Sequence, residues 1–327
     1  MEKSDWNTIR KQFPRKGLSR ATLLIWMCDL LLIGFSLFLF QLKGVYIILS
    51  WFFLTIALLH TYLLQHEATH NALSKSSTVN DSLGHFFSWL IFMPYLSRKR
   101  SHVLHHRYTG HPTLGPANKR AIEFFSVLSD DMSRKLELIW KYWIPLFVLN
   151  DRVGLWRDPF QNTHKNHDSL SLKKERNYSI LYILLYLLAL IVLFRTSLLV
   201  TVLFWYLPAL IFLFYLEELV NLPHHAETPL LGKEEKPLHF SKQYLVSHSC
   251  KHVPIWSNIF LLNFNRHIPH HLFPWVPWDQ LPRLEDKIRM NIAPYIIEEK
   301  TRNEIKWSIT NRKRSILDII GHYFDKR

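Results

Sequence analysis

The sequence predicts an all-α integral membrane protein with four transmembrane helices in two hairpins and a cytoplasmic poly-histidine site for two metal ions. Three observations predict this class. Apolar residues, 48% of the chain, gather into four long blocks, histidines cluster after these blocks, and basic residues lie mostly on one side of them. No stretch is typical of a second folded unit, so residues 1–327 are interpreted as a single domain.

Each of the four apolar blocks is close to the roughly 20 residues that a helix needs to cross a bilayer core. They cover residues 21–42, 45–65, 178–194 and 197–216. Only a few residues separate the members of each pair, so we expect two tight hairpins with all the remaining bulk of the chain on one side.

The basic residues predict which side this is. Six Lys or Arg precede the first block and four surround the start of the third, whereas the tight turns carry only Lys43 and Arg195. Positive residues near span ends stay in the cytoplasm, so both termini and residues 1–20, 66–177 and 217–327 are expected there. The net charge of +14 then lies beside anionic lipid, which favours a membrane surface over nucleic acid as partner.

Shorter segments carry further expectations. Residues 1–20 are expected to lie against the head groups, and residues 83–96 are apolar but too short to cross, which predicts an interfacial or re-entrant segment. The stripe over residues 136–147 predicts one amphipathic helix with a kink at Pro145. Asp29 and His60 have similar depths in the first two spans, so a contact between them is possible.

The two cysteines are predicted to lie in different parts of the protein. Cys28 falls inside the first span and Cys250 in the cytoplasmic part, so no disulfide is expected.

Four histidine clusters follow the spacings of a metal chelate. They are HEATH at residues 66–70, HVLHH at 102–106, NLPHH at 221–225 and HIPHH at 267–271. On a helix, positions i, i+3 and i+4 share one face, so their imidazoles reach a common ion. His224 and His225 compete for one place, and His225 is favoured because it forms N-x-x-x-H with Asn221. The candidate ligands are His66, His70, His102, His105, His106, His225, His267, His270 and His271.

Nine imidazoles exceed the roughly four protein ligands of one zinc ion, so two metal ions are predicted. The metal stays open at this point, because imidazole suits zinc, copper, nickel and iron. The outlying histidines are interpreted as structural or surface residues, with His111 and His252 the most suited to support the ligands. They are His85, His111, His164, His167, His239, His248, His252 and His322.

The three boxes HEATH, HVLHH and HIPHH, with NLPHH before the last and LFPWVPW after it, resemble the membrane fatty acyl desaturases. These belong to the integral-membrane diiron desaturase and hydroxylase superfamily, and the resemblance covers residues 45 to 285. It implies a mushroom-shaped helical fold with four spans and a cytoplasmic helical cap. It also implies two irons held by the nine histidines, a water held on one iron by Asn221, and use of dioxygen and two electrons.

The expected reaction follows from the chemistry of the substrate. A methylene hydrogen has no acidity for a side chain to exploit, so a metal oxidant is needed. We therefore expect an oxygen-dependent desaturase acting on a fatty acyl lipid or an acyl thioester. Glu67, Glu217 and Glu218 are candidates to hydrogen-bond the ligand histidines. The predicted substrate tunnel is lined by Trp89, Tyr215 and Trp256.

The electron donor is expected to be a separate protein, a ferredoxin or a cytochrome b5-like protein, because no fused donor domain is visible. A basic cytoplasmic face suits an acidic partner. After the second box the chain reads RYTGHPTLGP, without the acidic residues that often follow in relatives. The substrate subclass, the position of the double bond and the acyl carrier are therefore open.

Two rival functions are compatible with the histidines. A hydroxylase or ketolase of the same superfamily, acting on a carotenoid, sterol or alkane, would share the metal site. A metal transporter is a more remote alternative, since transport places ligands near mid-membrane, whereas these gather at one end of the spans.

Overall fold

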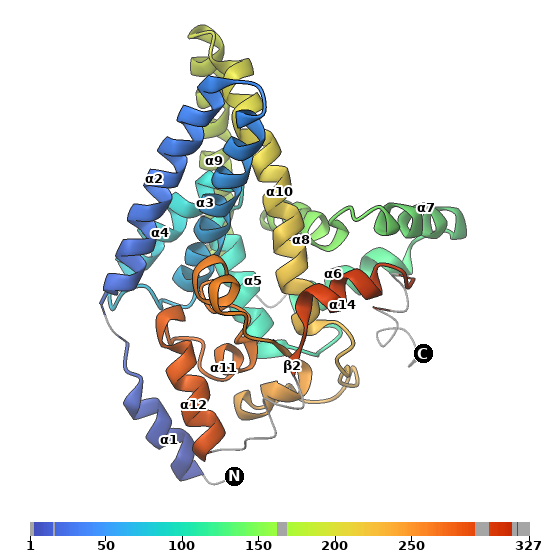
Figure 1. Cartoon of the computed structure of the whole chain (residues 1–327). Helices are drawn as coiled ribbons and strands as arrows, with labels where there is room; N and C mark the ends of the chain where they lie inside the picture. Colours follow the sequence, from blue (N-terminus) through green and yellow to red (C-terminus); the bar gives the residue numbers. More distant parts are fainter. Residues whose placement is uncertain (1–2, 16, 162–168, 292–300, 316–318, 320–327) are drawn as a thin grey trace.

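The computed structural model describes residues 3–15, 17–161, 169–291, 301–315 and 319. This part of the chain is mostly helical, and its short strands form a two-stranded parallel sheet (Figure 1). The helices of the first half are α1 (Lys3–Gln12), α2 (Arg20–Leu42), α3 (Tyr46–Thr69), α4 (Ser77–Leu90), α5 (Tyr95–Tyr108), α6 (Pro116–Ser126), α7 (Asp130–Lys141), α8 (Leu146–Arg157) and η1 (Asp158–Phe160). The second half contains α9 (Ser169–Arg195), α10 (Leu199–His225), η2 (Phe240–Val246), β1 (Ser249–Cys250), η3 (Trp256–Phe260), α11 (His267–Leu272), η4 (Trp278–Gln280), α12 (Leu281–Asn291), β2 (Thr301–Arg302) and α14 (Glu304–Asn311).

Four of these helices, α2, α3, α9 and α10, are long and apolar enough to cross a membrane, and they contain the four predicted blocks except residues 45, 197 and 198. They form the elongated upper part of Figure 1, with the shorter helices below and beside it. Two boundaries differ from the prediction. Helix α9 begins at Ser169 rather than near residue 178, and α10 continues past residue 216 and through Pro223 to His225. The fourth span and the NLPHH cluster therefore share one helix.

Helix α3 is the central element. Its apolar span is 67% buried, against 17% for α2, 11% for α9 and 17% for α10. Helices α2, α4 and α10 pack around it, and its side chains Leu59 and Leu64 are fully buried in this core. A helix that is apolar all round suits such a position.

Polar contacts join the long helices inside the apolar part. The predicted contact between Asp29 of α2 and His60 of α3 is confirmed, with 2.6 Å from Oδ1 to Nδ1. The other ring nitrogen, Nε2, lies 2.9 Å from the carbonyl oxygen of Ile259, which can only accept. The His60 ring therefore links α2 and α3 to residue Ile259 of η3. The Ser36 hydroxyl of α2 donates to the backbone carbonyl oxygen of Ser50 of α3 at 2.9 Å.

The structure shows how the two short apolar segments fold. Residues 83–96 form the end of α4 and the start of α5, because the chain turns at Phe92 (φ 53) and Pro94 then caps α5; their interfacial or re-entrant position stays a prediction. The stripe over residues 136–147 is not one kinked helix: α7 ends at Lys141, Trp143 adopts a positive φ of 65, and α8 starts after Pro145. A helix break at these points is invisible to helical periodicity.

The N-terminal helix α1 also differs from its expected position against head groups. Its side chains Trp6, Ile9 and Phe13 are buried in a second apolar cluster with α11 and α12. Trp275 donates its indole N–H to the carbonyl oxygen of Phe13 at 3.1 Å. Helix α1 thus covers the helix that carries HIPHH.

Candidate metal centre

All four histidine clusters lie on helices, as their spacing predicts. HEATH ends α3, HVLHH lies on α5, NLPHH ends α10 and HIPHH forms most of α11. Helix α11 is positioned by β1, where the Ser249 hydroxyl accepts from the backbone N–H of Ile268 at 3.0 Å. The structure brings the nine predicted histidines into two buried or half-buried groups, each with its ligand atoms within 4.8 Å of one another. The first group is His66, His70, His102, His106 and His270, and the second is His105, His225, His267 and His271.

In the second group the Nε2 atoms converge. His225 Nε2 lies 2.7 Å from that of His267 and 3.2 Å from that of His105, and His267 Nε2 lies 3.0 Å from that of His271. A ring nitrogen binds a zinc-sized ion at about 2.0–2.1 Å, so two such ligands at right angles are about 3 Å apart. The spacing therefore suits nitrogen atoms that share an ion.

The Nε2 atoms of the first group also converge. His106 Nε2 lies 3.2 Å from the Nε2 atoms of both His102 and His270. The Nε2 atoms of His66 and His70 are buried and make no hydrogen bond within the described part of the chain. Buried polar atoms are nearly always paired, so unpaired nitrogens aimed at a common point fit the binding of a cation.

The protonation state also fits metal binding. Burial, reinforced by neighbouring histidines, lowers the pKa of His102, His106 and His271 well below 6.5. Burial lowers the pKa of His270 to about 3. The imidazoles are thus neutral at pH 7, which is the form that binds a metal. The donor set fits a pair of metal ions and does not by itself select the metal.

Several second ring nitrogens are held by neutral groups rather than by the predicted carboxylates. His271 Nδ1 donates to Gln243 Oε1 at 3.2 Å, and His225 Nδ1 donates to the carbonyl oxygen of Val246 at 3.4 Å. Both contacts leave Nε2 free for an ion. Gln243 lies on η2, and no pattern in its sequence context pointed to this role.

The predicted supporting glutamates have different surroundings. Glu67 Oε1 lies 3.8 Å from His66 Nδ1, and its Oε2 accepts from the backbone N–H of Trp278 at 2.9 Å. Glu217 instead forms a buried ion pair with Arg152, and Glu218 forms one with Arg312. Neither Glu217 nor Glu218 has a hydrogen bond to a ligand histidine, so their predicted role needs correction: they stabilise the wall beside the site.

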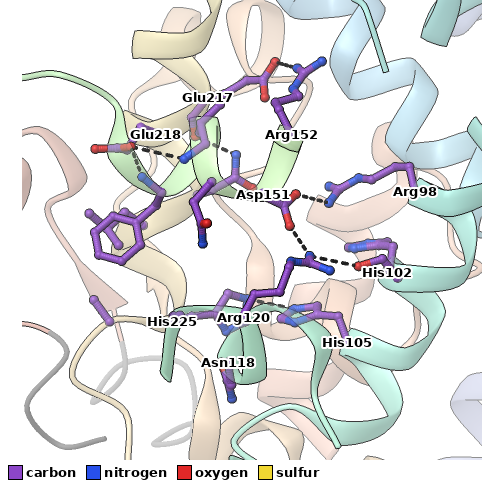
Figure 2. A pocket seen from close by; sticks show the side chains of 18 of the residues that line it. Arg98, His102, His105, Asn118, Arg120, Asp151, Arg152, Glu217, Glu218 and His225 are labelled. Atoms are coloured by element: carbon purple, nitrogen blue, oxygen red, sulfur yellow. Dashed lines mark hydrogen bonds and ion pairs between the residues drawn. The ribbon is translucent and has the colours of Figure 1, made fainter. Parts of the chain in front are cut away.

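A cavity of about 210 Å³ opens beside the histidines. Figure 2 shows His102, His105 and His225 at its base, with Arg98, Asp151 and Arg120 close by. Arg120 bonds to Asp151, and Arg98 lies 3.6 Å from the same carboxylate, so the charges on this wall are paired. Neighbouring arginines hold the pKa of Asp151 below its usual range despite burial. The apolar lining consists of Met93, Ala121, Phe147, Val148, Leu222, Ala226, Phe264 and Ile319.

Asn221 lines the same cavity, one helical turn before His225. Its Oδ1 accepts from the Tyr62 hydroxyl at 3.2 Å, and its Nδ2 donates to the carbonyl oxygen of Glu217 at 2.6 Å. These bonds fix the amide beside the second group.

The aromatic side chains predicted for a tunnel lie elsewhere, and none of the three lines this cavity. Trp89 stacks on Tyr186 with 6.1 Å between ring centroids. Tyr215 lines a separate pocket with Trp140, and Trp256 donates to Glu304 at 2.5 Å.

The outlying histidines stay outside both groups where the structure describes them. His111 Nδ1 accepts from the backbone N–H of Leu114 at 3.2 Å, which is a local turn contact. His252 is exposed and lies 3.4 Å from Arg266. The expected support of the ligands by these two is therefore not present in the structure. His164, His167 and His322 lie outside the described residues.

The fold and the site define a class of protein: helical membrane proteins in which polyhistidine helices meet to form two metal-binding groups. A family model described as fatty acid desaturase matches residues 43–302. The chain therefore belongs to the fatty acid desaturase family, and it is an oxidoreductase by this membership.

Curated relatives agree with this assignment. The chain is 23% identical over 281 residues to an sn-1 oleoyl-lipid 12-desaturase of Anabaena variabilis, covering 80% of this chain and 73% of that one. It is 28% identical over 248 residues to an endoplasmic-reticulum omega-3 fatty acid desaturase of Vigna radiata var. radiata, covering 72% and 63%. It is 26% identical over 264 residues to an acyl-lipid omega-3 desaturase (cytochrome b5) of Arabidopsis thaliana, covering 75% and 64%.

Proposed function

We propose that this chain is an oxygen-dependent desaturase that introduces a double bond into the alkyl chain of a fatty acyl lipid or acyl thioester, using a diiron centre. The observation that carries the proposal is the pair of histidine groups with converging Nε2 atoms beside a cavity. Family membership and the names of the relatives support a lipid substrate. When bound, a pair of irons would supply the dioxygen-dependent oxidant that hydrogen removal from a methylene requires.

The side chains around the cavity would position the alkyl chain and exclude water. Phe264 and Leu222 offer apolar contact next to His225, while the paired charges of Arg152 and Glu217 keep the opposite wall rigid. Gln243 and the Val246 carbonyl hold two imidazoles in one tautomer. Asn221, fixed by Tyr62, would hold a water molecule beside the second group.

The metal centre and the described parts outside α2, α3, α9 and α10 are proposed to face the cytoplasm. Lys and Arg residues near the corresponding ends of the spans support this orientation. Electrons would then come from a separate ferredoxin or cytochrome b5-like protein, and the printed name of the Arabidopsis thaliana relative supports the second. Reduction of the purified protein by each candidate donor would separate them, and protease digestion of sealed vesicles would test the orientation.

Lipid analysis of a host that expresses the chain tests the proposed function. We expect the wild type to produce an acyl chain that has lost two hydrogens, and His270→Ala to produce none. The matched control is His252→Ala, because His252 is exposed and lies outside both groups. Identical lipid profiles for the wild type and His270→Ala would refute the catalytic role, and a product that has gained one oxygen atom would identify a hydroxylase instead.

A further inference from the structure

A third cluster of ligand-type side chains lies beside the second histidine group. It consists of His224, Cys250 and Glu304, which offer one ring nitrogen, one thiol and one carboxylate oxygen within 4.8 Å of one another. All three are buried, with exposed fractions of 0%, 4% and 4%. A histidine, a cysteine and a glutamate buried together are rare unless they are paired or bind a metal.

The imidazole of this cluster lacks partners. Within the described residues, both ring nitrogens of His224 make no hydrogen bond, whereas the Glu304 carboxylate accepts from the Trp256 indole N–H at 2.5 Å and from the Cys250 thiol. A neutral imidazole has one donor and one acceptor nitrogen, so His224 loses both of its possible bonds. A buried polar atom without a partner destabilises the folded state, and a bound cation would offset this cost for the atom that it contacts.

The three side chains come from three separate elements. His224 lies in the last turn of α10, Cys250 ends β1 and Glu304 begins α14, which lies against the lower end of α10 in Figure 1. Strand β1 pairs with β2 over only two residues, with Cys250 opposite Arg302. Such a short ladder gives little stability alone, so a common ion would add a direct link between these elements.

The cluster is chemically distinct from the two histidine groups. Cysteine sulfur, histidine nitrogen and glutamate oxygen are all donors that zinc accepts, whereas the two groups contain imidazole alone. A thiolate and a carboxylate together balance the charge of a divalent ion. The nearby cation Arg302 lies 3.6 Å from its own partner, the Glu227 carboxylate.

The cluster also abuts the second group without sharing a residue with it. The ring of His224 stacks on that of His267 with 4.1 Å between centroids and 9° between planes. The neighbouring residue His225 belongs to the second group. An ion on His224 would therefore stabilise the end of α10 where His225 is held.

We propose that His224, Cys250 and Glu304 form a third, mononuclear site for a zinc-like divalent cation, which ties α14 and the β1–β2 pair to the end of α10. Its role is structural support of the neighbouring histidine group. A fourth position would be filled by water.

Metal binding by the purified full-length protein tests the proposal. Wild-type protein loaded with Co²⁺ is expected to show thiolate-to-cobalt charge-transfer absorption, because imidazole groups alone cannot produce it. Cys250→Ser should abolish this absorption and raise the Kd for one Zn²⁺ by at least about 100-fold. Cys28→Ser is the matched control, since Cys28 is the exposed cysteine of α2.

The outcomes separate this proposal from the proposed function. His270→Ala should lose product formation yet keep the cobalt–thiolate absorption, and Glu304→Gln should weaken Zn²⁺ binding without removing the thiol. Absence of the absorption in the wild type would overturn the third site even if a serine variant failed to fold. Equal Zn²⁺ stoichiometry in the wild type, Cys250→Ser and Glu304→Gln would overturn it as well.

Discussion

The two histidine groups differ in what surrounds them. In the first group only His102 lines the cavity, and His66 and His70 lie at the buried end of α3. In the second group three of the four histidines, His105, His225 and His267, line it. A molecule in the cavity therefore meets the second group first. The comparison teaches that two similar sets of imidazoles can have unequal access to substrate.

The groups also differ in their supporting contacts. A carboxylate oxygen of Glu67 lies 3.8 Å from His66 Nδ1 in the first group, whereas the neutral amide of Gln243 accepts from His271 in the second. A nearby carboxylate raises the basicity of a ligand histidine. We therefore expect the first group to hold its ion more tightly and the second to be more open to exchange.

The largest expected effect comes from low pH, which acts on the histidines of both groups at once. Burial lowers the pKa of His70, His102, His105, His106, His267, His270 and His271 below the ordinary value of 6.5, and that of His270 to about 3. At a pH between the ordinary pKa of 6.5 and the lowered pKa of the folded state, the unfolded chain binds protons that the folded chain does not. The stability of the fold is therefore complete above pH 6.5 and is lost as pH falls. Each such group contributes about 1.4 kcal/mol per pH unit in this window.

Thermal unfolding of metal-free protein between pH 7.5 and pH 4 measures this effect, with about pH 6.5 as the expected onset. The metal-loaded protein is the control, because a bound ion excludes the proton from Nε2 and shifts the onset to lower pH. A melting temperature that does not change with pH in the metal-free protein would contradict neutral, buried imidazoles.

The second-largest effect is expected for variants that each remove the ion of one group. His66→Ala should remove the ion of the first group and His225→Ala that of the second, and each should lower desaturation by more than about 100-fold because both ions are needed. Iron per chain, measured by elemental analysis, should fall by one ion in each variant. His239→Ala, at an exposed position outside both groups, should change neither quantity. Complete iron loss from either single variant would show that the groups are not independent.

The smallest expected effect tests the contribution of Glu67 to the first group. Glu67→Gln keeps an acceptor for the Trp278 N–H but removes the carboxyl group near His66. In a His225→Ala background, where the first group would hold the remaining ion, iron affinity should fall about 10- to 100-fold. The rate of iron release to a chelator measures it. If Gln243→Leu has the same effect in this background, the assignment of Glu67 to the first group is wrong.

The elements that sequence could predict are those set by local periodicity. The four apolar blocks lie within four long helices, and each histidine cluster lies on a helix whose face presents its ligands together. The contact of Asp29 with His60 was also predictable, because helical rise fixes depth along two adjacent spans.

The features that the sequence could not predict depend on contacts between distant segments. The role of Gln243 arises only when η2 packs against α11, and Glu217 pairs with Arg152, which lies on a different helix. The helix break at Trp143 depends on a positive φ that its sequence context does not announce. Periodicity reports which residues share a face, and it carries no information about which segment that face meets.

Both groups draw ligands from α11, with His270 in the first and His267 and His271 in the second. During synthesis on the ribosome, neither group is complete until this late segment has emerged and folded back against α3, α5 and α10. Loading of the proposed metal centre would therefore come late, after all four apolar helices have been synthesised. A nascent chain that stops before residue 267 would expose unfilled imidazoles and become a target for quality control.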